Sequence, residues 1–274
     1  MNHTATSAPA LFIGHGSPMN AIEDNRYTRA WRDLGQRLAV PRAILAVSAH
    51  WYMRGTAITA MANPRTIHDF GGFPQALFDV RYPAPGDIAL AREVRDMLTP
   101  LPVALDEACG LDHGTWSVLI HMYPQAQVPV LQLSIDATQP PLFHHELGKR
   151  LQALRDSGVM IFGNGNVVHN LRTIQWQPDA PAPQWAVTFN DYVKDAVRRG
   201  DHAALIDYRA AGESAELAVP SLEHYLPLLY VLGAAREDES PEILIDGIEL
   251  GTISMLSVGV GVNSGFHPRS PGEN

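Results

Sequence analysis

The chain has 274 residues, of which 46% are hydrophobic and 18% charged, and this is enough for a large packed core. A net charge of −9 without any basic stripe excludes a nucleic-acid partner, and the lone Cys109 excludes an intrachain disulfide and fits a reducing compartment. The first residues lack the pattern of a secretory signal, and the longest apolar stretch, "TISMLSVGVGV", is too short to span a membrane. We therefore expect a soluble, cytoplasmic protein without a membrane partner.

Short apolar runs alternate with helical patterns along the chain. Strands are predicted at residues 10–13, 43–48, 56–60, 130–133, 159–162 and 253–258. Helices are predicted near residues 26–38, 88–98, 115–122, 144–156, 187–199 and 225–235. The Pro-rich segment 177–185 is predicted to be a long surface loop.

This alternation predicts an α/β fold with a central, largely parallel or mixed sheet flanked by helices. Continuous apolar strands without polar alternation are typical of strands that are covered on both faces. No internal repeat or low-complexity linker interrupts the pattern, so residues 1–274 are expected to form a single domain.

Twelve histidines are an unusual number for this composition, and six of them carry no functional pattern. His3 and His267 lie near the termini. His144 and His145 open a predicted helix and are expected to be solvated. The two others, His121 and His202, lie in helical patterns without a partner motif.

Four other histidines follow predicted strands or begin a predicted helix. His50 follows the strand 43–48, His15 follows the strand 10–13 between two glycines, and His169 follows the strand 159–162. His224 precedes the helix in "EHYLPLL", where Pro227 is tolerated because it lies in the first turn. Ligands of open α/β sheets bind at the carboxyl ends of the strands, so these four side chains could converge on one edge.

Common catalytic motifs do not fit the chain. Gly14-His15-Gly16 lacks the third glycine of a dinucleotide fingerprint, and neither a phosphate loop nor a G-x-S-x-G elbow is present. Nothing indicates an activated thiolate at Cys109. Imidazole suits iron, zinc and copper, but the spacing of the histidines forms no local metal-binding signature and by itself favours scattered core or surface histidines over a metal site. Trp51 and Trp116 could line an aromatic pocket or belong to the core.

Six separated segments carry a family resemblance. They are "GHGSPMNAIEDN", "SAHW", "IHDFGGFPQALFDVRYPAPG", "DHGTWSVL", "NGNVVHNLRT" and "EHYLPLLYVLGA". In this order they resemble the segments of extradiol aromatic ring-opening dioxygenases of the 4,5-DOPA dioxygenase (DODA) type, especially the bacterial branch. This family belongs to the superfamily that includes the catalytic subunit of protocatechuate 4,5-dioxygenase. The resemblance covers about residues 10–262.

The resemblance implies a single-domain α/β fold that holds one divalent non-haem metal per chain. By this likeness, His15, His50 and His224 hold the metal. His169 stands beside it, either as a fourth ligand or as the catalytic acid/base.

The resemblance also implies a substrate pocket next to the metal. His113 of "DHG" lies in this pocket, where it can hydrogen-bond the substrate or oxygen. His68 of "HDFGGFP" shapes the pocket without an assigned chemical role, and Trp51 of "SAHW" is expected to line it.

One position departs from the wider superfamily, which often uses two histidines and a carboxylate. The third position here is His224, with Glu223 adjacent. Three neutral ligands leave a divalent metal more positive, which favours an anionic catecholate but also favours zinc. Fe(II) for turnover and Zn(II) as the bound metal are therefore both expected.

The resulting functional prediction is extradiol ring cleavage of catechols such as L-DOPA, with insertion of both atoms of O2. A zinc-dependent hydrolase and a non-catalytic metal-binding protein are the alternatives, and each would use the same histidines. The expected partners are a small-molecule catechol and O2, and the expected assembly is a monomer or small homo-oligomer.

Overall fold

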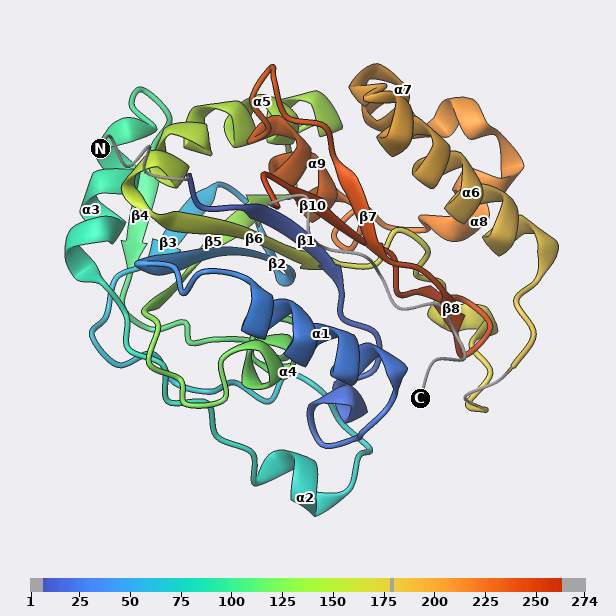
Figure 1. The fold of residues 1–274 in the computed structure, drawn as a ribbon, viewed down its shortest axis with the longest axis horizontal. Coiled ribbons are helices and arrows are strands. Elements are labelled where there is room, and N and C mark those ends of the chain that lie inside the picture. Colours follow the sequence, from blue (N-terminus) through green and yellow to red (C-terminus); the bar gives the residue numbers. More distant parts are fainter. Residues whose placement is uncertain (1–6, 178–179, 263–274) are drawn as a thin grey trace.

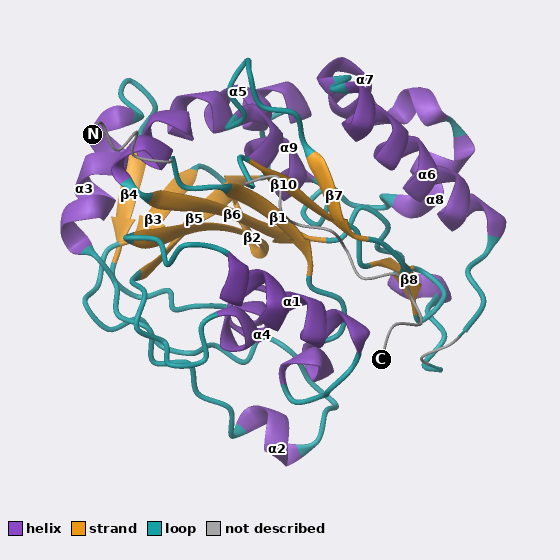
Figure 2. Cartoon of the chain, in the orientation of Figure 1, coloured by secondary structure: helices purple, strands orange, loops and turns teal. Residues whose placement is uncertain are grey.

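The fold is built on one eight-stranded sheet (Figures 1 and 2). The computed structural model describes residues 7–177 and 180–262. The strand order across the sheet is β4-β3-β5-β2-β6-β1-β10-β7, and β8 pairs with β9 in a separate two-stranded sheet. The strands are β1 (Ala10–Gly14), β2 (Ala43–Met53), β3 (Thr56–Thr59), β4 (Val103–Asp106), β5 (Val130–Asp136), β6 (Val159–Gly165), β7 (Glu242–Ile245), β8 (Ile248–Glu249), β9 (Ile253–Ser254) and β10 (Ser257–Val260).

The central strands β5, β2, β6 and β1 pair in parallel. Antiparallel pairing joins β3 to β5, β1 to β10 and β10 to β7. Strands β1, β5 and β6 are buried along their whole length, as expected of parallel strands covered on both faces. The predicted α/β class with a mixed central sheet is confirmed. Because β1, β2 and β6 run in the same direction, their carboxyl ends meet at one edge of the sheet.

Helices cover both faces of this sheet, with α1 and α4 on one side and α5 and α9 on the other (Figure 1). The helices are α1 (Arg26–Arg37), α2 (Gln75–Phe78), α3 (Ile88–Met97), α4 (His113–Met122), α5 (Pro141–Leu151), α6 (Gln184–Arg199), α7 (His202–Ile206), α8 (Glu213–Ala218) and α9 (Leu226–Gly233). In the described part of the chain, no helix is both long and apolar enough to cross a membrane.

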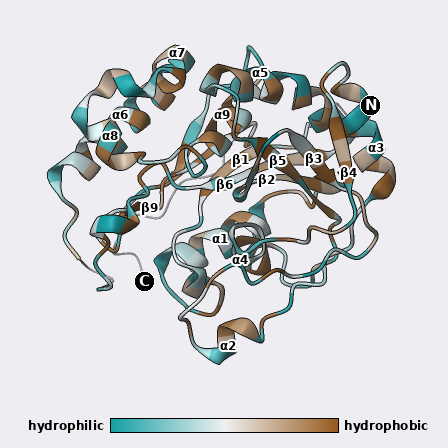
Figure 3. Ribbon diagram, turned by 180° about the vertical axis from the view of Figure 1, so that it is seen from behind, coloured by the Kyte–Doolittle hydropathy of each residue, from teal (hydrophilic) through white to brown (hydrophobic). Residues whose placement is uncertain are grey.

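Alternate side chains of each central strand enter opposite core layers. In β1, Leu11 and Ile13 belong to the layer that includes α1 and α4, whereas Ala10 and Phe12 belong to the layer that includes α3, α5, α6 and α9. This is the two-residue period of a strand with two covered faces. Figure 3 shows the apolar strands between the two helical layers.

Several predicted boundaries differ from the structure. Strand β2 does not end at Ser48 but continues through His50 to Met53, with irregular pairing between Val47 and Tyr52. The predicted strand 253–258 is split into β9 and β10. Strands β4 and β7, the two edge strands of the sheet, were not predicted, because both are short and only partly buried and so lack a continuous apolar run. Within the predicted loop 177–185, residues 178 and 179 lie outside the described residues, and α6 already begins at Gln184.

The expectation that His144 and His145 are solvated was wrong, because both are buried where α5 packs on α9. The ring nitrogen Nδ1 of His144 lies 2.9 Å from the Tyr230 hydroxyl, and Nε2 of His145 lies 3.0 Å from Nδ1 of His202. A Cβ atom on Gly148 would lie 2.2 Å from the Tyr230 carbonyl oxygen, so the two helices approach too closely for any side chain there. His3 and His267 lie outside the described residues.

The buried His144 predicts a loss of stability in acid. Burial lowers the pKa of His144 to about 4, whereas an unfolded histidine titrates near 6.5. The stability that neutral His144 contributes is therefore complete above pH 6.5 and is lost as the pH falls towards 4. At pH 5 the free energy of unfolding falls by about 2 kcal/mol through this group. Urea unfolding at pH 7 and pH 5 should show a smaller decrease for His144→Gln than for the wild type; equal decreases would contradict this.

Candidate metal centre

Five histidines meet at the edge formed by the carboxyl ends of β1, β2 and β6. His15 follows β1 directly, and His50 lies near the end of β2. His113 is the first residue of α4, His169 follows β6, and His224 precedes α9 by two residues. The structure thus brings together the four histidines that the sequence singled out at strand and helix ends, and adds His113 to them.

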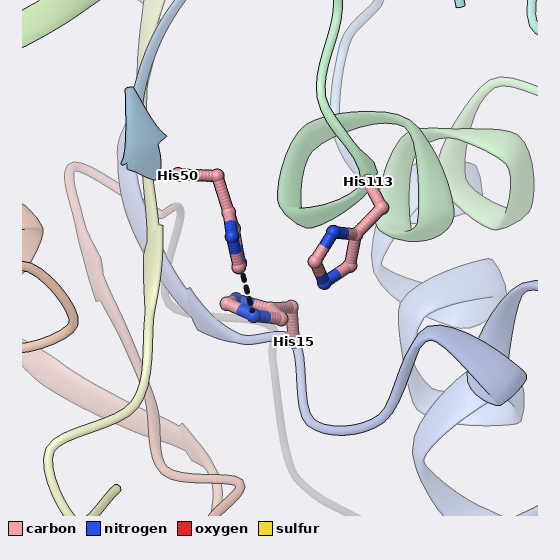
Figure 4. Close-up of side chains that lie close together, drawn as sticks. All are labelled: His15, His50 and His113. Atoms are coloured by element: carbon pink, nitrogen blue, oxygen red, sulfur yellow. Dashed lines mark hydrogen bonds between the residues drawn. The ribbon is translucent and has the colours of Figure 1, made fainter. Parts of the chain in front are cut away.

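Three of these rings form a compact group (Figure 4). The nitrogens Nε2 of His15 and His50 face each other at 3.2 Å, and the ring centroid of His113 lies 4.0 Å from that of His50. One ring nitrogen of each of the three lies within 4.8 Å of the other two, a spacing that one metal ion can bridge.

A second group adjoins the first. The rings of His169 and His224 stack with centroids 3.5 Å apart and planes within 8°. Nδ1 of His224 lies 3.4 Å from Oε1 of Glu223, so these three residues could also share a metal. The His224 ring lies 5.1 Å from that of His50 and 5.5 Å from that of His15, between centroids.

The backbone of His15 is held from two sides. Its N–H donates to the Gly165 carbonyl, and its own carbonyl accepts a hydrogen bond from the buried Asn20 side chain at 3.1 Å. Gly14 leaves no room for a side chain, since a Cβ would lie 2.7 Å from the Met255 backbone, and Gly16 adopts a positive φ of 64°. The two flanking glycines therefore permit a tight turn that other residues would strain.

Asp69 links two of the histidines and was missed in the sequence, where its only signal is its place directly after His68. Its Oδ2 lies 3.2 Å from Nδ1 of His50. Its Oδ1 accepts the backbone N–H of His113 at 3.0 Å and lies equally close to the Nδ1 of that ring, an electrostatic contact rather than a well-directed hydrogen bond. A carboxylate facing Nδ1 favours the tautomer in which Nε2 carries the lone pair.

Burial keeps four of these rings uncharged. Burial and the neighbouring histidines lower the pKa of His50 to about 3 and that of His15 and His224 well below the usual value. Burial likewise lowers the pKa of His169 to about 4. Although burial alone would raise it, the facing rings of His113 and His50 lower the pKa of Asp69 to about 2. At neutral pH the site therefore combines four neutral imidazoles with the ionised carboxylate of Asp69.

This chemistry fits a transition metal. Among the described residues, the buried Nδ1 of His15 has no hydrogen-bond partner, and Nε2 of the same ring faces another Nε2. Neutral imidazole lone pairs gathered in this way match the ligand preferences of iron, zinc and copper. Burial raises the pKa of the Cys109 thiol to about 11, so a thiolate does not compete for this chemistry.

A family model described as the catalytic LigB subunit of aromatic ring-opening dioxygenase matches residues 9–261. The chain belongs to this family. It is an aromatic ring-opening dioxygenase, and the resemblance drawn from its six sequence segments is confirmed.

Relatives and a solved structure agree with the family. The dioxygenase is 55% identical over 262 residues to the 4,5-DOPA dioxygenase extradiol of Escherichia coli K12, covering 94% of this chain and 96% of that protein. It is 35% identical to the 4,5-DOPA dioxygenase extradiol of Beta vulgaris, with 89% and 93% covered. A crystal structure of an uncharacterised protein from Escherichia coli K12 superposes with a TM-score of 0.81 at 50% identity, covering 92% of this chain and 99% of that one.

The rings of Phe70, His68 and Trp116 form an aromatic cluster beside His113. The Phe70 ring lies 5.4 Å from that of His113, and the His68 ring lies 5.7 Å from Phe70 and 5.5 Å from the buried Trp116. His68 therefore lies outside the histidine cluster, with Phe70 between it and His113. Trp51 is half-buried next to His50, and its place in a substrate pocket stays a prediction.

The position of Asp69 predicts that it supports metal binding. Asp69→Asn removes the negative charge that faces Nδ1 of both His50 and His113. We expect metal affinity to fall by about 10–100-fold, the usual effect of removing a carboxylate behind a histidine ligand. Competition with a chelator measures this loss. Asp79→Asn is the matched control, because Asp79 lies in the same segment between β3 and α3 but is exposed, and this variant should keep wild-type affinity. Equal metal affinity of the two variants would contradict the role of Asp69.

Proposed function

We propose that this dioxygenase cleaves catechols such as L-DOPA next to their paired hydroxyls and inserts both atoms of O2. The observation that carries the proposal is the meeting of five histidines from five chain elements in a member of an aromatic ring-opening family. Relatives from Escherichia coli and Beta vulgaris are named 4,5-DOPA dioxygenase extradiol, which supports the substrate class.

We assign His15, His50 and His224 as the ligands of one divalent metal per chain, with His169 as a further ligand at rest. The Nε2 atoms of His15 and His50 face each other, which supports these two histidines as ligands whichever residue is the third. His113 lies closer to His50 than His224 does, so it is the competing third ligand. Bound Fe(II) would supply the Lewis-acid and redox chemistry that brings a catechol and O2 together.

In turnover, His169 acts as the acid/base. Its lowered pKa keeps the imidazole neutral, so it can accept the proton of the second catechol hydroxyl and return it later. Stacking on His224 holds the ring parallel to a ligand. His113, which belongs to the group of His15 and His50, hydrogen-bonds the substrate or oxygen, and Asp69 lies next to its Nδ1. His68 and Trp51 complete the pocket wall.

Fe(II) is the metal proposed for turnover, and Zn(II) is the competing occupant. Three neutral ligands suit either ion. The alternatives of a zinc-dependent hydrolase and a non-catalytic metal-binding protein are not favoured, because the family and the named relatives are dioxygenases. We also propose that residues 1–274 act as a single catalytic domain in the cytoplasm, as a monomer or small homo-oligomer.

The substrate assignment predicts selectivity for paired hydroxyls. The iron-loaded protein should consume O2 with L-DOPA and form a yellow product, whereas tyrosine should give no uptake because it offers only one oxygen to the metal. An oxygen electrode and absorption spectra measure both. The zinc-loaded protein is the control and should consume no O2. Equal uptake with tyrosine and L-DOPA would overturn the assignment.

The histidine roles predict two kinds of loss. His15→Ala should empty the site, whereas His169→Ala should keep its metal and lose turnover by about 10²–10⁴, the usual worth of a positioned acid/base. Metal analysis with single-turnover rates separates the two. His224→Ala and His113→Ala identify the third ligand in the same way, because the variant that loses its metal has lost the ligand.

His202→Ala is the control for these variants, since its ring contacts His145 rather than the cluster. It should keep metal and activity. If His15→Ala and His169→Ala lose metal equally, His169 is a ligand and the acid/base role passes to His113.

A further inference from the structure

A buried polar network lies directly behind His50 and His113. It is formed by five side chains with at most 4% exposure: Ser48 of β2, Asp112 and Thr115 at the start of α4, Gln132 of β5 and Asn164 of β6. Three adjacent strands and one helix thus contribute to a single cluster. Burying so many polar groups is costly unless they are hydrogen-bonded to one another.

Asp112 is the centre of this network. Its Oδ1 accepts hydrogen bonds from the Ser48 hydroxyl at 2.7 Å and from the Thr115 backbone N–H at 3.2 Å. Its Oδ2 accepts one from Nε2 of Gln132 at 2.7 Å, and its own backbone N–H donates to Oε1 of Gln132 at 3.0 Å. Asp112 and Gln132 therefore hold each other through two complementary contacts.

The first connection runs from Asp112 to His113. Asp112 is the N-cap of α4, and His113 is the next residue. An N-cap side chain fixes where a helix begins. Because Gln132 belongs to β5, the contact between Asp112 and Gln132 fixes the beginning of α4 on the sheet and, with it, the backbone of His113.

The second connection runs from Asp112 to His50. Between Val47 and Tyr52, β2 advances five residues while its partner β5 advances only two, so regular pairing with β5 is interrupted around His50. The His50 backbone N–H donates instead to Oγ of Ser48 at 3.2 Å. That hydroxyl is the one that donates to Asp112, so one carboxylate holds both histidine backbones.

The space around the network leaves little freedom. A Cβ on Gly114 would lie 2.4 Å from Oδ1 of Asn164 and 2.9 Å from Cδ2 of His50. Asn164 itself donates to the Thr115 hydroxyl at 3.0 Å and lies 2.9 Å from Oγ of Ser48. The start of α4 therefore packs so closely on Asn164 and the His50 ring that position 114 has room for glycine only.

We propose that Asp112 is a positioning residue that, through Gln132 and Ser48, sets the separation of His50 and His113 in the metal centre. This rests on the proposed function in that His50 is taken as a metal ligand. Asp112 itself contacts neither metal nor substrate. Its effect is geometric, and any pair of side chains with the same complementary hydrogen bonds should replace Asp112 and Gln132.

A side-chain swap tests this. In Asp112→Asn an amide N–H faces Nε2 of Gln132, so two donors meet. In Gln132→Glu two carboxylates meet. The double variant restores one donor facing one acceptor. Each single variant should weaken Zn²⁺ affinity by about 10–100-fold, as removal of an orienting partner does, and the double variant should return to within about threefold of the wild type, since only a coupled pair shows such recovery.

Chelator competition gives the Zn²⁺ affinity, and the visible spectrum of the Co²⁺-loaded protein reports the ligand geometry without any turnover. The wild-type Co²⁺ spectrum should return in the double variant. Tyr230→Phe is the control for a lost buried hydrogen bond, because it removes the hydroxyl next to His144. It should lower the melting temperature and leave Zn²⁺ affinity unchanged.

Two results would overturn the proposal. Single variants that melt lower but keep wild-type affinity and spectrum would show a purely structural network. A double variant that recovers its melting temperature but not its affinity would show that the charge at position 112 matters, rather than the geometry. Neither result depends on ring cleavage, and absence of O2 uptake by the iron-loaded wild type would contradict the proposed function alone.

Discussion

The close packing of five imidazole rings at one edge of the sheet is the constraint on which the rest of the molecule depends. A positively charged imidazolium is strongly disfavoured where it is shielded from water and surrounded by other histidine rings. His15, His50, His169 and His224 therefore all have lowered pKa values. Neutral rings have lone pairs that need a partner. A divalent cation satisfies several at once, which links the acid–base state of the cluster to the chemistry of a ring-opening dioxygenase.

The mixed sheet holds these rings in place because it is rigid where they attach. Strands β1, β2 and β6 are parallel neighbours covered by helices on both faces, so their carboxyl ends cannot move independently. The irregular pairing of β2 places His50 in the histidine cluster, and Asp69 and Asp112 approach the same two histidines from different sides. Asp69 therefore contacts the histidine rings directly, whereas the Asp112 network lies one layer further from the site and contacts the backbone that carries them.

The elements that could be predicted are those whose signal is local. The continuous apolar runs of β1, β5 and β6 and the helical periods of α1 and α3 appear in the structure close to their predicted ranges. The errors fall where tertiary packing overrides local pattern. Strand β2 passes its predicted end because β5 pairs with it again at Tyr52 and Met53, and His144 is buried because α9 covers the face of α5 that carries it.

The sequence by itself determined the fold class, the family and the histidines at the ends of β1, β2 and β6, because apolar period and motif order are properties of neighbouring residues. Only the tertiary structure decided that His113 joins His15 and His50, that Asp69 faces two of these rings, and that Asp112 holds both backbones through Ser48 and Gln132. The contacts of Asp112 with Ser48 and Gln132 join residues 64 and 20 positions apart in the chain, and no local pattern encodes a meeting that depends on the register of β2 against β5 and β6.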